Sequence, residues 1–419
     1  MERRGVSRAL LIAAVIVVIV AIALAAFFMA REEAKPEKIT VLARSGTYAE
    51  GLKIAAAQFE AETGIRVEVQ ELGYKELYDK LSTEALQKTG AFDVVMLDDP
   101  WLAGFASQGF LEDIGRMLEE RGLTVDPDFI DSAIEVSKYK GTLYALPYAG
   151  NVQLFVYRTD LYSKYGFSKP TTWNDVLEAA KKIYEEEGIY GYVIRGKKGN
   201  PVVTNFLPIF WAHGAKIVDE NGNVMVDSPQ AIAALKLFIE LKKYSPPGTE
   251  SFDSAEVKAS IFEGRVAASI IWPAWVPDIN DPSKSKAAGN VEVIPPPGAA
   301  PMIGAWLLAI PVSSKNKDTA LDFILFVLSK DMQKKIALEA GVPPTRESLY
   351  TDPDVVAKYS WYPTQLEALK NSQMRPRVPE WSQIEDILAN YIHQALIGAM
   401  SPEEALSKAK QEIEAVVKG

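Results

Sequence analysis

Tryptophan residues stand in three turn-like segments of the chain, which read DDPW at 98–101, WPAW at 272–275 and GAW at 304–306. Proline or glycine marks each segment as a break between regular elements. A single such tryptophan is most often part of a hydrophobic core. Several together with carboxylate, amide and guanidinium groups suit a sugar, because indole rings cover its apolar faces while polar groups bind its hydroxyls. The polar and aromatic candidates grouped with these tryptophans are Asp98, Tyr148, Asn151 and Arg375.

The sequence offers little evidence for catalysis or for binding of a metal or nucleotide. The chain has no cysteine and 2 histidines, which excludes disulfides and cysteine-ligated metals and leaves little for a histidine site. Segment 191–198 lacks the Ser or Thr of a phosphate-binding loop, and 219–224 lacks the glycine of a calcium loop. Neither G-x-S-x-G nor H-E-x-x-H occurs. We expect no enzyme, no metal and no cofactor, although a glycosidase pair of carboxylates stays open because its spacing is spatial.

Length and charge restrict the class of protein further. The 419 residues suggest two or three domains, and 48% apolar with 24% charged residues is ordinary for a folded chain. Basic residues number 45 against 55 acidic ones, a net charge of −10. Since nucleic-acid binding needs a basic face, we expect no nucleic-acid partner.

The N-terminal segment predicts export of the remainder. Arginines at 3, 4 and 8 precede an apolar run at 9–29. About 20 apolar residues cross a bilayer, whereas the core of a signal peptide has about 7–15. The length favours an uncleaved transmembrane anchor over 1–30, with the rest of the chain on the extracellular face. The alternative is a signal peptide cleaved near residue 25 or 30. Residues 31–38 read as a polar linker.

Beyond the linker, the hydrophobic pattern predicts alternating strands and helices. Apolar runs at 39–42, 65–69 and 92–97 predict strands, with amphipathic helices between them. The order βαβαβ indicates a parallel sheet with helices on both faces, where ligands bind beyond the carboxyl ends of the strands. The residues expected at that edge are Arg44, Ser45, Tyr48, Tyr74, Asp98 and Trp101.

The same α/β pattern resumes after residue 144. Capping sequences predict helix starts at 172–175, 253–256 and 401–404, and the Asn-Gly pair at 221–222 predicts a hairpin. The sequence therefore predicts a large α/β protein of two lobes.

The exported part resembles the extracellular solute-binding proteins of ABC transporters, family 1, sugar-binding type. The archaeal trehalose- and maltose-binding proteins look most similar. The resemblance rests on fragments that occur in the family's order over nearly the whole exported part. Among them are FEAETGIRVEV at 59–69, AFDVVMLDDPWLAGFASQGFLEDI at 91–114, FEGRVAASIIWPAW at 262–275 and MRPRVPEW at 374–381.

The resemblance implies roles for particular residues. The acidic residue that ends the strand before the Trp-Leu pair is Asp98, expected to bind sugar hydroxyls with Trp101 beside it. Asn151 stands where the family often has an acidic residue before its YR-x-DL motif. This amide keeps hydrogen bonding but leaves the identity of the sugar open. Tyr148, just upstream, is expected to form a platform.

Further candidates follow from the same motifs. Trp272 matches the W-P position and Trp306 the G-x-W position, both expected to stack on the ligand. Arg375 matches the R-P position, where a guanidinium clamps hydroxyls. Tyr48 and Glu50 lie in the first loop and complete the expected site.

The fold that the resemblance implies is a type II periplasmic-binding-protein-like fold, with a ligand cleft between two lobes. We expect lobe 1 at 39–147 plus 272–325 and lobe 2 at 148–271 plus 326–419. We expect hinge closure to bury a sugar, a di- or oligosaccharide such as maltose or trehalose, for delivery to membrane permease subunits. We expect a monomer. The alternatives are a binder of polyamine or anion and an exported glycoside hydrolase.

Overall fold

The structure is a computed structural model that describes residues 36–219, 222–298 and 300–418. The predicted anchor or signal segment at 1–30 lies outside the described residues, as does most of the predicted linker. Within the described ranges, no helix is both long and apolar enough to cross a membrane.

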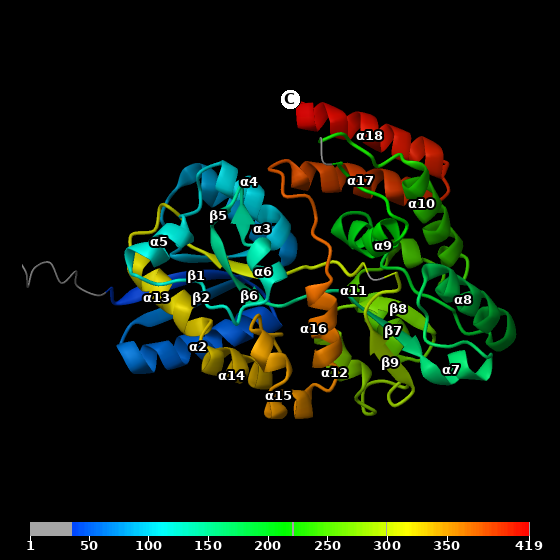
Figure 1. Ribbon diagram of the computed structural model, residues 1–419, viewed down its shortest axis with the longest axis horizontal. Coiled ribbons are helices and arrows are strands. Elements are labelled where there is room, and N and C mark those ends of the chain that lie inside the picture. The colour runs from blue at the N-terminus through cyan, green and yellow to red at the C-terminus, as the bar shows by residue number, and fades with distance from the viewer. Residues whose placement is uncertain (1–35, 220–221, 299, 419) are drawn as a thin grey trace, which may run out of the picture.

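A five-stranded sheet forms the centre of one lobe, at the left of Figure 1. Its strand order is β2-β1-β3-β10-β6. β1 pairs in parallel with β2 and β3, as the βαβαβ pattern predicted, whereas β10 is antiparallel to β3 and β6. The strands are β1 (Lys38–Arg44), β2 (Arg66–Leu72), β3 (Val94–Asp98), β6 (Ala145–Ala149) and β10 (Trp306–Ala309).

Helices cover this sheet, and one hairpin accompanies them. The helix α2 fills the connection between β1 and β2, and α3 fills the connection between β2 and β3. The helical elements are α2 (Thr47–Thr63), α3 (Tyr74–Gln87), η1 (Asp99–Trp101), α4 (Leu102–Ser107), α5 (Ile114–Glu120), α6 (Asp131–Glu135), α13 (Lys317–Val327), α14 (Lys330–Ala340), η4 (Glu347–Tyr350), α15 (Pro353–Lys358) and α16 (Tyr362–Lys370). The hairpin consists of β4 (Lys138–Tyr139) and β5 (Thr142–Leu143).

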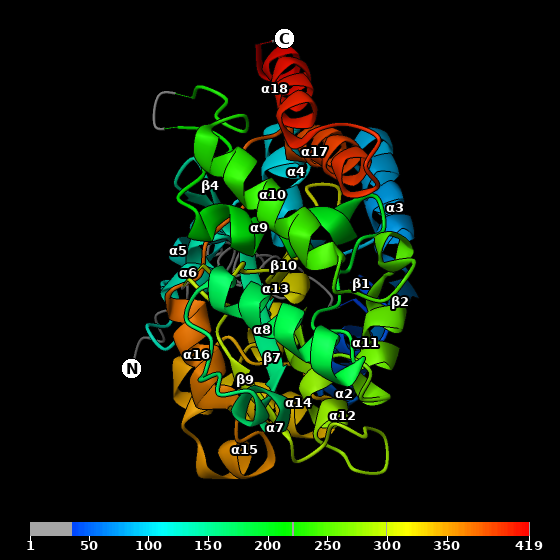
Figure 2. The same ribbon diagram turned by 90° about the vertical axis from the view of Figure 1, so that its right-hand side faces the viewer.

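The other lobe contains a small antiparallel sheet of β7 (Leu154–Arg158), β8 (Ala268–Ile271) and β9 (Val291–Ile294), with β7 in the middle. Figures 1 and 2 show α17 and α18 beside α9 and α10 at one end of this lobe. The helical elements are α7 (Thr159–Lys164), α8 (Trp173–Glu187), α9 (Asn200–Ala212), α10 (Pro229–Lys242), η2 (Thr249–Ser251), α11 (Ser254–Phe262), η3 (Pro273–Trp275), α12 (Val276–Ile279), α17 (Trp381–Leu396) and α18 (Pro402–Lys418).

Local capping chemistry fixes where two of these helices begin. Thr172 and Asp175 form a reciprocal capping box at α8, and Asp253 and Glu256 form another at α11. Each box satisfies backbone N–H groups that the first helical turn leaves without partners. Both predicted helix starts are confirmed.

The buried apolar residues form two clusters. One contains the five-stranded sheet and the buried faces of α13 to α16, and the other contains those of α8 to α10, α17 and α18. The sequence assigned residues 326–419 to the second lobe, but buried residues between 328 and 369 pack with the first cluster, where α14 lies against α2. The lobe boundaries themselves stay a prediction.

Three chain segments cross between the lobes and bind one another through their backbones (Figure 1). The Gly304 N–H donates to the Asn151 carbonyl at 2.9 Å, and the Ile303 N–H donates to the Gln373 carbonyl at 3.1 Å. We call residues 151–153, 301–304 and 373 the crossover ladder. The ladder lies between β6 and β7 and directly before β10, so the ends of β6 and β10 lie beside the junction of the two lobes.

Candidate ligand-binding site

A cavity of about 620 Å³ lies where the two lobes meet. Six of the nine residues predicted for the site line it, although they come from positions up to about 330 residues apart in the chain. These six are Tyr48, Asp98, Asn151, Trp272, Trp306 and Arg375. The sequence-based candidates Glu50, Trp101 and Tyr148 do not line this cavity.

Aromatic rings form the wall on the side of the five-stranded sheet. Trp306 opens β10, and its ring centroid lies 5.3 Å from that of Tyr48 and 6.1 Å from that of Tyr74. Trp101 packs edge-on behind Trp306, with centroids 5.9 Å apart and planes at 89°. Trp101 therefore supports the wall from behind instead of facing the cavity, because its ring is enclosed by neighbouring aromatic side chains.

Tyr148 and Glu50 also lie away from the cavity. The buried Tyr148 donates its hydroxyl to the Tyr48 carbonyl at 2.9 Å. A Cβ at Gly51 would lie 2.3 Å from that hydroxyl oxygen, so the glycine permits the contact. Tyr148 thus holds the first turn of α2, which carries Tyr48. The Glu50 side chain is 58% exposed and pairs with Lys53 at 2.8 Å on the outer surface.

Another part of the lining brings an indole ring near a buried amide oxygen that has no partner among the described residues. Trp272 follows β8 and lies against Gly304, where a Cβ would come within 3.1 Å of two ring carbons. Asn151 is 6% exposed, and among the described residues nothing donates to its buried Oδ1. A buried acceptor without a partner is costly, so this oxygen is ready to accept a hydrogen bond from a ligand.

A buried cluster of charges closes the end of the cavity. The Arg375 guanidinium is 2% exposed and donates from Nη2 to Asp98 Oδ1 at 3.2 Å and Asp99 Oδ2 at 2.7 Å. The Tyr74 hydroxyl donates to Asp98 Oδ2 at 2.7 Å. Arg377 adds a bond from Nη1 to the Asp99 carbonyl at 2.6 Å. The cluster fixes the segment after α16 onto the carboxyl end of β3.

Burial and pairing determine how these groups ionise. Burial raises the pKa of Asp99 to about 6, against the opposing effect of Arg375. Burial lowers the pKa of Arg375, but Asp98 and Asp99 more than offset this, so its pKa is raised overall. Burial, followed by the charge of Asp98, holds the pKa of Tyr74 well above its ordinary value. Arg375 therefore remains a cation and Tyr74 a neutral hydroxyl donor.

Sequence reasoning missed several polar residues on the wall of the second lobe. Arg195 donates from Nε to Asp253 Oδ1 at 2.9 Å and from Nη1 to Thr204 Oγ1 at 3.2 Å. Burial raises the pKa of Asp253, but the charge of Arg195 and hydrogen bonds outweigh this, so the pKa is lowered. Arg195 lies in the segment rejected as a nucleotide loop, and Asp253 was read only as a helix cap. No motif or spacing in the sequence indicated Asn200, which begins α9.

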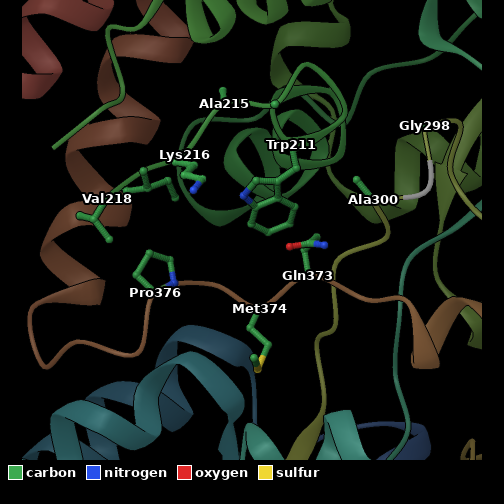
Figure 3. A pocket seen from close by; sticks show the side chains of 11 residues that line it. Trp211, Ala215, Lys216, Val218, Gly298, Ala300, Gln373, Met374 and Pro376 are labelled. Atoms are coloured by element: carbon green, nitrogen blue, oxygen red, sulfur yellow. The ribbon is translucent and has the colours of Figure 1, made fainter. Parts of the chain in front are cut away.

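A second cavity, of about 510 Å³, lies beside the segment that carries Arg375. Figure 3 shows Trp211 and Lys216 on one side of it, with Gln373, Met374 and Pro376 on the crossing segment. None of the nine predicted site residues lines this second cavity. Over the described part of the chain, no group of three or more His, Cys, Asp or Glu side chains could hold a metal ion.

Comparison with known proteins decides the family. Residues 45–334 match the model of the bacterial extracellular solute-binding protein family. This chain belongs to that family. The resemblance stated from the sequence is confirmed: the molecule is the solute-binding protein of an ABC transporter and not an enzyme.

Relatives of this solute-binding protein cover nearly all of its length. A probable amino-acid ABC transporter periplasmic-binding protein of Sinorhizobium fredii is 26% identical, over 91% of this chain and 90% of that protein. The mannitol-binding protein of Pseudomonas aeruginosa is 29% identical, over 80% of this chain and 82% of its own length.

Solved structures give the same architecture. Maltose-bound MalE3 of T. maritima has a TM-score of 0.81 and 31% identity, covering 90% of this chain and 99% of that one. A solute-binding protein of Agrobacterium radiobacter K84, in complex with ribitol, has a TM-score of 0.82 and 28% identity, covering 90% and 99%. The predicted two-lobed fold is confirmed.

Proposed function

We propose that this solute-binding protein captures a neutral sugar or polyol in the 620 Å³ cavity and delivers it to a membrane permease. The observation that carries the proposal is that Trp306, from the five-stranded sheet, and Trp272, which follows β8 of the small sheet, both line the cavity, with the unpartnered Asn151 oxygen on the same lining. Such an arrangement offers apolar faces together with a free acceptor. Relatives that bind mannitol, maltose and ribitol support the same class of ligand.

The state of the charges favours a neutral ligand over an anion or a polyamine. The Arg375 guanidinium is already paired with Asp98 and Asp99, and Arg195 is paired with Asp253. An anion would have to displace the buried pairs of Arg375 or the partly exposed Arg195–Asp253 pair, and a polyamine would have to take their carboxylates. Breaking a buried ion pair costs about 3–5 kcal/mol, whereas sugar hydroxyls bind to the pairs without breaking them.

Closure of the lobes would complete the binding. Trp306 belongs to the five-stranded sheet, Trp272 directly follows β8 of the small sheet, and its ring lies against Gly304 of the crossover ladder. Rotation about the ladder changes the distance between the two indole walls. A ligand that touches both walls stabilises the closed form by its greater affinity for that form, which lets a permease distinguish loaded from empty protein.

The position of the protein is part of the proposal. On sequence alone, we propose that the apolar run at 9–29 is either a transmembrane anchor or the core of a cleaved signal peptide, with the lobes outside the membrane in both cases. A tethered monomer would hold captured sugar close to its permease. We retain maltose and trehalose as the specific candidates.

The test is thermal unfolding with intrinsic tryptophan fluorescence, against maltose, trehalose, mannitol, ribitol, spermidine and phosphate. At a concentration of 100 Kd, a ligand of the folded state adds about 2.7 kcal/mol. Trp272→Ala should abolish the rise in unfolding temperature that the ligand causes, while Trp211→Ala, in the second cavity, should keep it. A shift with spermidine or phosphate alone would contradict the proposal, as would an equal loss in both variants.

A further inference from the structure

An acidic residue outside the cavity controls one of the polar groups that line it. Asn200, at the start of α9, lines the cavity, and its Nδ2 donates to Glu385 Oε1 at 2.9 Å. Glu385 comes from α17 and is 8% exposed. Among the described residues, no other side chain or backbone group bonds to the Asn200 amide. The orientation of this amide therefore depends on Glu385.

The protonation state of Glu385 decides how strictly the amide is oriented. An ionised carboxylate only accepts hydrogen bonds, so the amide nitrogen of Asn200 must face it and the amide oxygen must face the cavity. A protonated carboxyl also donates, so it can bind the amide oxygen and leave the nitrogen toward the cavity. Protonation thus converts one permitted orientation into two.

The surroundings bring this titration close to neutral pH. Burial is the largest effect and raises the pKa of Glu385 to about 7. The Arg375 charge opposes that rise, while Asp98 on β3 and Asp386 on the same helix add to it. The charge of Glu385 in turn helps to raise the pKa of Tyr74 on α3, whose hydroxyl donates to Asp98. A modest change of pH therefore changes the charge of a group one hydrogen bond away from the cavity.

We propose that Glu385 is a positioning residue that turns the Asn200 oxygen toward the ligand and makes sugar affinity increase with pH between about 6 and 8. The inference rests on the proposed function, because it assumes that sugar hydroxyls donate to this oxygen. Binding and ionisation then support each other: a hydroxyl bound to the oxygen strengthens the donation from Asn200 Nδ2 to the Glu385 carboxylate.

The experiment is fluorescence titration of the protein with maltose and with mannitol at pH 6 and pH 8. One hydrogen bond of ordinary strength corresponds to about a two- to tenfold change in affinity, and we expect the wild type to bind that much more weakly at pH 6. Glu385→Gln imitates the protonated form, so it should bind weakly at both values. Asp386→Asn, which removes the neighbouring exposed carboxylate on α17, is the matched control; it should keep a pH-dependent affinity, with a slightly lower midpoint because Asp386 adds to the pKa of Glu385.

Asn200→Ala separates positioning from a direct electrostatic effect. If Glu385 acts through the amide, this variant loses the pH dependence. If Glu385 acts on Arg375 and Asp98 directly, the variant keeps it, which would overturn the inference. Retention of the wild-type profile by Glu385→Gln would overturn it as well, with the sugar-binding proposal left intact.

A measurement without sugar keeps the two proposals distinct. In an NMR titration, the Asn200 side-chain NH₂ signals should move with the same midpoint as the Glu385 carboxyl carbon. Absence of binding to every sugar and polyol at pH 8 would refute the proposed function, and with it the predicted pH dependence of sugar affinity. An unmoved Asn200 signal would refute the positioning role alone.

Discussion

Removing the charge of Glu385 should stabilise the fold at pH 8. The pKa of this carboxyl rises from an ordinary 4.5 to about 7 because the folded protein buries it. Each pH unit between folded and unfolded pKa values is worth about 1.4 kcal/mol, so keeping the ionised group buried costs on the order of 3 kcal/mol. Glu385→Gln retains the volume and an acceptor for Asn200 but carries no charge. We expect it to unfold about 3–4 °C higher than the wild type, given the unfolding entropy of a chain of about 400 residues.

The stability gained by Glu385→Gln should depend on pH between about 4.5 and 7. The folded state holds the Glu385 proton more tightly than the unfolded state does, so this group favours folding most below the unfolded pKa of 4.5. That contribution is lost as the pH rises through the folded pKa of about 7. Glu385→Gln and wild type should therefore have similar stability at pH 4.5 and should differ fully only above pH 7.

Differential scanning calorimetry at pH 4.5, 6 and 8 measures this directly. Asp386→Asn removes an exposed carboxylate from the same helix and serves as the control, with an unfolding temperature that should stay near the wild type at each pH. A Glu385→Gln protein that is less stable at pH 8 would refute the reasoning. That result would mean that the bond with Asn200 and the charge of Arg375 outweigh the cost of burying the carboxylate.

Three further changes test other parts of the site. Arg375→Met should cost about 3–5 kcal/mol in urea unfolding at pH 8, because it leaves the buried Asp98 without a cation and Asp99 with only Arg377 at 3.8 Å. The cost should be smaller at pH 5, below the Asp99 pKa of about 6. Gly304→Ala should weaken sugar binding with little effect on stability, since its Cβ displaces the Trp272 ring; unchanged affinity in fluorescence titration would count against that ring as a ligand platform. Tyr148→Phe should lower stability by about 1 kcal/mol in calorimetry, through the lost bond to the Tyr48 carbonyl, and an effect near zero would contradict its supporting role.

The local parts of the fold could be predicted from the sequence. The apolar runs at 39–42, 65–69 and 92–97 correspond to β1, β2 and β3, because short strands between amphipathic helices leave a clear periodic signal. The insertion of β10 between β3 and β6 left no such signal, since its partners are more than 150 residues away. The packing of α14 on α2 was missed for the same reason.

The site residues divide in the same way, into those that a sequence motif indicates and those that only the folded structure places. Turn-marked tryptophans and family motifs pointed to Trp272, Trp306 and Asn151, which line the cavity. The position of Trp101 one layer behind Trp306 is set by packing, and a motif does not distinguish a lining residue from its support. The sequence did not indicate Glu385, because an acidic residue on an amphipathic helix is expected to be solvated. Its burial comes from the packing of α17 against other elements of the fold, α9 among them.

The buried carboxylate therefore has opposite effects on folding and on binding, and this opposition can be tested. Natural proteins break a stabilising rule mainly at functional sites, and Glu385 breaks one, because it is a buried carboxylate whose side chain is bonded to an amide and, among the described residues, to no cation. If its role is to orient Asn200, then Glu385→Gln gains stability and loses affinity together. In that background, Asn200→Ala should cost less affinity than it does in the wild type, because the amide is already free to turn. If the fold-changes in affinity of the two single variants multiply to give that of the double variant, Glu385 and Asn200 act independently. The burial of Glu385 would then have no functional reason.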